Sequence, residues 1–92
     1  MGTNKHKQEA AVLRLETRFE TVAGMRTEYR LEFENGYWLE AMRGGERSRV
    51  FLGDVSDMAW KFLKLAAQGH VTPCTLEAVC ADFIYLQEVG DK

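Results

Sequence analysis

Strict two-residue alternation over two consecutive segments is the feature that most constrains this chain. Charged side chains occupy every second position from Arg14 to Glu20 and again from Arg26 to Glu34, with apolar or hydroxyl side chains between them. A period of two is typical of β-strands that have one apolar and one polar face. The pattern predicts two strands, over about residues 13–21 and 26–34.

The glycines after these segments predict the turns and therefore the strand pairing. A three-residue loop of Val22, Ala23 and Gly24 places Phe19 opposite Thr27 and leaves apolar residues facing apolar residues. The opposite face then contains four pairs of opposite charge, which a one-residue slip would destroy. These pairs are Glu20–Arg26, Arg18–Glu28, Glu16–Arg30 and Arg14–Glu32.

Two further turns extend the sheet to four strands. A three-residue loop of Glu34, Asn35 and Gly36 pairs Leu31 with Leu39, and a two-residue Gly44-Gly45 loop pairs Leu39 with Val50. The last turn also predicts pairs on both faces of the sheet: Tyr37–Leu52, Ala41–Ser48, Glu40–Arg49 and Trp38–Phe51. The result is an antiparallel meander in the order 1-2-3-4.

Helical spacing and capping residues predict two helices after the sheet. The first has Asp54 or Ser56 as N-cap and ends at Gly69. The second has Thr72 as N-cap and Pro73 as its first residue. The predicted core positions of the first helix are Val55, Met58, Ala59, Phe62, Leu65 and Ala66, with Trp60 and Leu63 widening this stripe to one side. Those of the second helix are Leu76, Val79, Cys80, Phe83 and Leu86 or Gln87.

These elements predict an α+β fold, a four-stranded antiparallel meander followed by two helices packed on one face (ββββαα). The 92 residues suffice for one domain. We expect a disordered leader over residues 1–10, the domain over 11–89 and a frayed tail over 90–92. The apolar face of an open sheet needs a cover, and the alternative to complete cover by the two helices is a second protomer.

The composition argues against several classes of protein. The net charge of −2 gives no overall cationic surface for nucleic acid. Cys74 and Cys80 are too few for a disulfide scaffold and predict free thiols in the cytoplasm. No apolar run approaches the roughly 20 residues of a membrane span, so no membrane association is expected.

The segment from Val71 to Val79, with Asp82 and Phe83, resembles the C-terminal signature V-T-P-x-T-L-x-x-V-x-x-D-F of a family of small uncharacterised clostridial (Firmicutes) proteins of unknown function. The resemblance covers about residues 12–86. It implies a cytoplasmic bacterial protein with a strand-rich N-terminal half, and it implies no activity.

No residue pattern predicts chemistry. His6 and His70 are the only histidines, and His6 lies in the predicted leader. His70 and two cysteines outside a C-x-x-C are one ligand short of the usual zinc set. No phosphate-binding glycine loop is present. A pair of His70 and Cys74 at a helix start is conceivable for nucleophilic catalysis, but helix capping and packing explain both residues. We therefore expect no catalytic residue, metal or cofactor.

Three apolar residues interrupt the charged face of the predicted sheet: Trp38, Met42 and Phe51. A clustered apolar patch on a polar face is typical of an interface. The leading prediction is therefore a protein-interaction or adaptor module, with a second copy of the chain as one candidate partner. The alternative is nucleic-acid binding through Arg43, Arg47 and Arg49, although Glu28, Glu40 and Glu46 lie among them and would repel phosphate.

Overall fold

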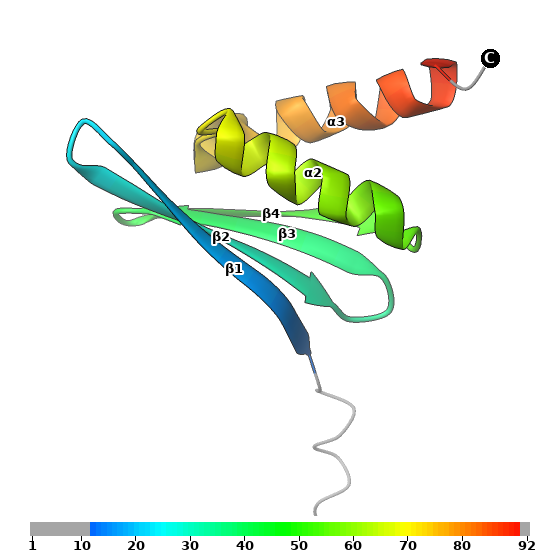
Figure 1. Cartoon of the computed structure of the whole chain (residues 1–92), viewed down its shortest axis with the longest axis horizontal. Coiled ribbons are helices and arrows are strands. Elements are labelled where there is room, and N and C mark those ends of the chain that lie inside the picture. The colour runs from blue at the N-terminus through cyan, green and yellow to red at the C-terminus, as the bar shows by residue number, and fades with distance from the viewer. Residues whose placement is uncertain (1–11, 91–92) are drawn as a thin grey trace, which may run out of the picture.

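Four antiparallel strands and two helices make up the part of the chain, residues 12–90, that the computed structural model describes (Figure 1). The sheet has the order β1-β2-β3-β4, so the predicted ββββαα fold is confirmed. The elements are β1 (Leu13–Val22), β2 (Met25–Phe33), β3 (Tyr37–Arg43), β4 (Glu46–Gly53), α2 (Ser56–Gln68) and α3 (Pro73–Gly90).

Both helices lie on the same face of the sheet and cover it unequally. α2 packs mainly over β2 and β3, whereas α3 lies along β4 and β3. The buried core comes from β2, β3, β4, the two helices and their connection. Its largest fully buried side chains are Tyr29, Phe62, Leu31, Leu39, Leu63 and Leu76.

One buried polar group ties the two layers together. The Tyr29 hydroxyl on β2 donates a hydrogen bond of 2.7 Å to the backbone carbonyl of Val71 in the α2–α3 connection. A buried hydroxyl and a buried carbonyl would each be costly without a partner, so this bond fixes where the connection crosses the sheet.

The helix boundaries match the prediction more closely than the helix faces do. Gly69 caps α2 as predicted, but the N-cap is Val55 and no side chain caps that end. The buried residues of α2 include Leu63 and Ala67, whereas Leu65 and Val55 are exposed. Leu63, which was predicted to widen the stripe, is confirmed as a core residue, whereas Ala67 was not predicted. The apolar stripe is therefore rotated from the predicted one.

The pairings of the last three strands follow the predicted registers with one exception. Leu31 pairs with Leu39, and Leu39 pairs with Val50, as predicted. The pairs Ala41–Ser48, Glu40–Arg49 and Trp38–Phe51 are also confirmed. Tyr37 pairs with Gly53, so its predicted partner Leu52 was wrong. The ladder shifts register between Tyr37 and Trp38, which leaves Leu52 as an extra residue that is buried in the core.

The predicted register of β1 is wrong over most of the strand. The loop has two residues, because Val22 pairs with Met25, and it places Phe19 opposite Glu28 and Arg18 opposite Tyr29. A register shift between Arg14 and Glu16 restores the predicted partners only at the start of the strand, where Leu13 pairs with Phe33 and Arg14 with Glu32. The predicted pairs Glu20–Arg26, Arg18–Glu28 and Glu16–Arg30 are therefore absent.

The turn decides this register. Ala23 and Gly24 have φ angles of 53° and 80°, which is the two-residue geometry whose twist matches that of the flanking strands. In this register no residue of β1 is buried. Glu16, Arg18 and Glu20 consequently share the helix-covered side with the core residues of β2, and Phe19 faces the other side.

The predicted leader, residues 1–10, lies outside the described residues, as do the last two residues of the predicted tail over 90–92. Within the described part, α3 continues to Gly90 and so enters the first position of that tail. No helix among residues 12–90 is long and apolar enough to cross a membrane.

Replacing Tyr29 tests the bond between the layers. We expect Tyr29→Phe to lower the free energy of unfolding by about 1–2 kcal/mol, because it leaves the Val71 carbonyl without its donor. Tyr85→Phe is the matched control, since Tyr85 is exposed. Chemical denaturation followed by circular dichroism measures both. Equal stability of the two variants would contradict the structural role.

The same hydroxyl predicts a pH dependence. Burial raises the pKa of Tyr29 above the usual tyrosine value. The stability that the neutral phenol contributes is complete below a pH of about 10 and is lost as the pH rises through the raised folded-state pKa. The stability difference between wild type and Tyr29→Phe should therefore shrink above that pH. A difference that stays constant into the alkaline range would refute this.

Candidate functional site

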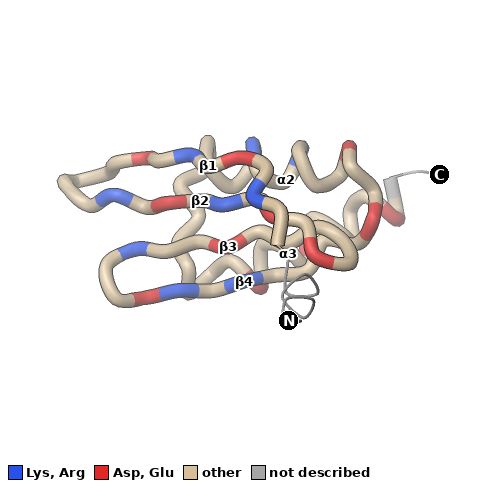
Figure 2. The backbone as a smooth tube through the Cα atoms, turned by 90° about the horizontal axis from the view of Figure 1, so that it is seen from below, with Lys and Arg blue, Asp and Glu red and all other residues tan. Residues whose placement is uncertain are grey.

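Charged residues recur along all four strands of the sheet (Figure 2), and those of β2, with Glu40, Arg47 and Arg49, lie on the face opposite the helices. Two carboxylates on this face are buried beneath arginines. Glu32 lies 3.8 Å from Arg14 and 3.7 Å from Arg49, and Glu40 lies 3.1 Å from Arg47. Each of these carboxylates meets two arginines, since Arg30 also lies 3.9 Å from Glu40. The charges of this face are therefore largely balanced within the face itself.

The predicted apolar patch is only partly assembled. Trp38 and Phe51 pack with ring centroids 4.8 Å apart. The Arg49 guanidinium lies 4.1 Å from the Trp38 ring centroid, and the Trp38 indole N–H donates to the Glu34 carbonyl at 2.9 Å. Phe51 stays 47% exposed.

Met42 is separate from this pair. It lies four residues from Trp38 on the same side of β3, about 13 Å away along the strand. The buried Glu40 stands between the two. The three residues of the predicted patch therefore do not form one continuous surface.

The three arginines of the nucleic-acid alternative do not form one surface either. Arg43 pairs with Thr27, which is buried on the helix side of the sheet. Arg47 and Arg49 lie on the opposite side, where each contacts at least one glutamate. A phosphate would have to compete with these carboxylates, so the arrangement does not favour this alternative.

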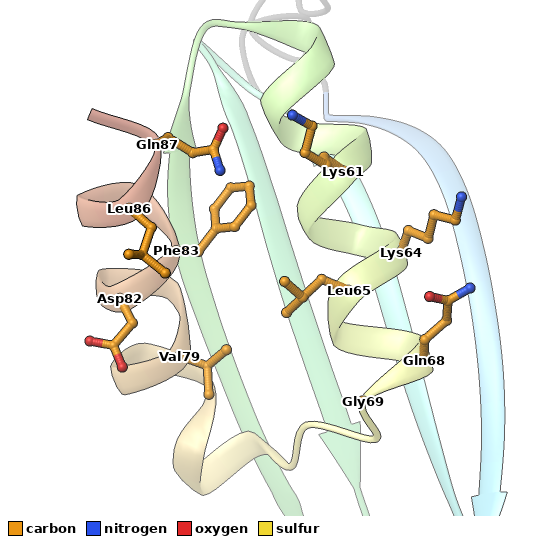
Figure 3. Close-up of a pocket in the computed structure, with 10 residues that line it drawn as sticks. All are labelled: Lys61, Lys64, Leu65, Gln68, Gly69, Val79, Asp82, Phe83, Leu86 and Gln87. Carbon is orange, nitrogen blue, oxygen red and sulfur yellow. The ribbon is translucent and has the colours of Figure 1, made fainter. Parts of the chain in front are cut away.

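A groove with a volume of about 770 Å³ lies between α2 and α3. Figure 3 shows Leu65 of α2 and Phe83 of α3 pointing into the space between the helices. Its lining is mainly apolar, with Lys61 and Lys64 on the α2 side and Asp82 on the α3 side. We call this feature the α2–α3 groove.

The second half of α3 continues the apolar surface of the groove. Figure 1 shows these turns rising away from the sheet. Tyr85 is 63% exposed and Leu86 is 61% exposed. Leu65 and Val89 are also exposed. The sequence contained a signal for this surface, because the consecutive apolar residues Ile84, Tyr85 and Leu86 cannot all face one core.

The two cysteines of α3 and His70 lie in different environments. Cys80 is buried, and burial raises the pKa of its thiol. Cys74 is exposed, with its sulfur 3.4 Å from the Thr72 hydroxyl. His70 instead lies 3.7 Å from Glu20 of β1. Over residues 12–90, no three His, Cys, Asp or Glu side chains are grouped so that they could hold a metal ion.

No family model, no curated protein and no solved structure matches this chain. The resemblance to the clostridial family therefore stays a prediction.

Gly36 holds the aromatic pair in place. Its φ is 124°, and a β-carbon there would overlap the Phe51 ring. We expect Gly36→Ala to destabilise the fold by roughly 2 kcal/mol and to displace Phe51 from Trp38. Denaturation and tryptophan fluorescence measure the two effects.

Gly45→Ala is the matched control, because a β-carbon at Gly45 meets no atom within 4 Å. Its stability should stay within about 0.5 kcal/mol of the wild type. Equal effects of the two glycine substitutions would show that Phe51 does not depend on Gly36.

Proposed function

We propose that this chain is a protein-interaction module that binds an apolar helical segment of a partner protein in the α2–α3 groove. The observation that carries the proposal is the exposed apolar surface of Leu65, Leu86 and their neighbours around this groove. Clustered apolar surface of this kind marks interfaces more often than catalytic sites.

The shape of the site favours a helix as the bound element. Two helices that diverge over a sheet leave an elongated trough, and an amphipathic helix fills such a trough with side chains at positions i, i+3, i+4 and i+7. Phe83 lies at the floor and is buried, while Leu65 and Leu86 stand at the two sides. A ligand helix would cover all three residues.

The charges at the rim of the groove indicate which residues should flank the apolar stripe of the ligand helix. Lys61 and Lys64 both lie on the α2 side of the groove, and the structure gives neither an acidic partner within 4 Å among the described residues. Acidic residues beside the apolar stripe of the ligand would complement them, which sets orientation more than affinity.

Phe51 supports a second, smaller contact surface. It is half exposed beside Trp38 on the opposite face of the sheet. This surface is a weaker candidate, because Arg49 already covers one side of the Trp38 ring and the indole N–H is already bonded.

The test uses a defined probe, a synthetic amphipathic peptide with leucines at heptad spacing and glutamates beside them. We expect the peptide to shift the backbone amide resonances of Leu65, Phe83 and Leu86 in a two-dimensional NMR titration. Leu86→Ser should weaken binding by about tenfold or more, because it removes a large apolar contact. Phe51→Ser is the matched control and should leave the affinity unchanged.

A peptide of identical composition with scattered leucines controls for unspecific apolar binding. Equal affinity for both peptides would contradict recognition of a helix. Resonance shifts confined to Trp38 and Phe51 would instead place the interaction on the second surface.

A further inference from the structure

β1 is an edge strand with an open backbone edge and unusual side-chain exposure. It lies at one end of the sheet order and, over its ten residues, has no buried position. Phe19 is 49% exposed, with the Arg26 guanidinium 4.6 Å from its ring centroid. Long exposed edges of this kind pair with further strands unless something prevents it.

The two-residue turn determines which backbone groups point outward from β1. Residues that flank such a turn exchange both hydrogen bonds, and the direction then alternates along the strand. Since Val22 pairs with Met25, Thr17, Phe19 and Thr21 turn their backbone N–H and C=O groups toward the open edge. Any strand added there must bond to these residues.

The side chains discriminate between the ways in which two copies of β1 could pair antiparallel. A two-fold axis at Arg18 or Glu20 would place identical charges opposite each other. An axis at Thr17 would bring Phe19 against Leu15, where β1 shifts register. An axis at Phe19 places Arg18 of each copy opposite Glu20 of the other, which makes two pairs of opposite charge. It also lets the whole segment from Glu16 to Val22 pair without crossing the register shift.

The other open edge lacks this complementarity. On β4, Arg47 and Arg49 alternate with Ser48 and Val50. The Gly44-Gly45 turn directs the backbone groups of Arg47, Arg49 and Phe51 outward by the same reasoning. Antiparallel self-pairing around Arg49 would set arginine against arginine. Such charges are a known protection of edge strands.

We propose that the chain forms a homodimer through β1, with two copies paired antiparallel about a two-fold axis at Phe19. The two Phe19 rings meet on the face opposite the helices, and two Arg18–Glu20 pairs form on the helix side. The result is one continuous eight-stranded sheet with no β1 edge. This inference does not depend on the proposed groove function, because the two surfaces share no residue.

Charge reversal tests the pairing. Sedimentation velocity at low and high micromolar concentration should show the wild type moving from monomer to dimer. Arg18→Glu should raise the dissociation constant by about tenfold, because both symmetric pairs change from attraction to repulsion. The double variant Arg18→Glu/Glu20→Arg should restore the dimer, since it recreates both pairs in reverse.

Restoration of the dimer by the second substitution would also show that Arg18→Glu weakens strand pairing and does not unfold the chain. A monomeric wild type at every concentration would overturn the proposal. Rescue of Arg18→Glu by Glu16→Arg in place of Glu20→Arg would also overturn it, because that result requires an axis at Thr17. Species larger than a dimer would show head-to-tail pairing of β1 with β4, which is incompatible with the two-fold arrangement.

Cysteine cross-linking locates the axis directly. In a Cys74→Ser background, Phe19→Cys should form a covalent dimer under mild oxidation, because residues directly opposite in a ladder have α-carbons about 5.5 Å apart, within disulfide range. Thr17→Cys is the control and should run as a monomer on a non-reducing gel, since Thr17 faces Thr21 of the second copy. Cross-linking at Thr17 alone would overturn the Phe19 axis. Binding of the amphipathic peptide should be the same in all these variants.

Discussion

The reach of the two helices over the sheet is the constraint on which the rest of this structure depends. α2 and α3 cover β2, β3 and β4, and the sheet contributes buried apolar residues from these three strands alone. β1 is held mainly by its pairing with β2 and by the turn that connects them, and it contacts α2 and His70 without burying any of its residues. A strand in this position has no core to align with, so its side chains are free to follow the geometry of the turn.

This difference explains which registers could be predicted from the sequence. Leu31, Leu39 and Val50 are buried on one face, so a one-residue slip would expose all of them, and the alternation predicts their pairing correctly. In β1 the same rule was misleading, since this strand buries none of its residues. The conformation of Ala23 and Gly24 decided the register, and residue type alone does not reveal it.

The candidate surfaces also differ in how far the sequence predicts them. The charged face of β2, β3 and β4 followed from the alternation, but Glu16, Arg18 and Glu20 of β1 lie on the helix side instead. The separation of Met42 from Trp38 also follows from strand geometry, with Glu40 between them. The run Ile84, Tyr85 and Leu86 indicates surplus apolar surface on α3, but the α2–α3 groove itself could not be predicted, because it depends on the angle at which the two helices diverge. The connection that sets this angle includes His70 at a positive φ of 54° and the Val71 carbonyl held by Tyr29.

The two proposed surfaces would act together in one assembly. A two-fold axis perpendicular to the sheet places the helices of both copies on the same face, so both grooves would open in one direction. Each groove lies above β3, which is five strand spacings, or roughly 24 Å, from β3 of the second copy. A partner with two apolar helices joined by a linker of that reach would bind the second site at a high effective concentration. Dimerisation through β1 would thereby convert a weak single contact into a selective double one.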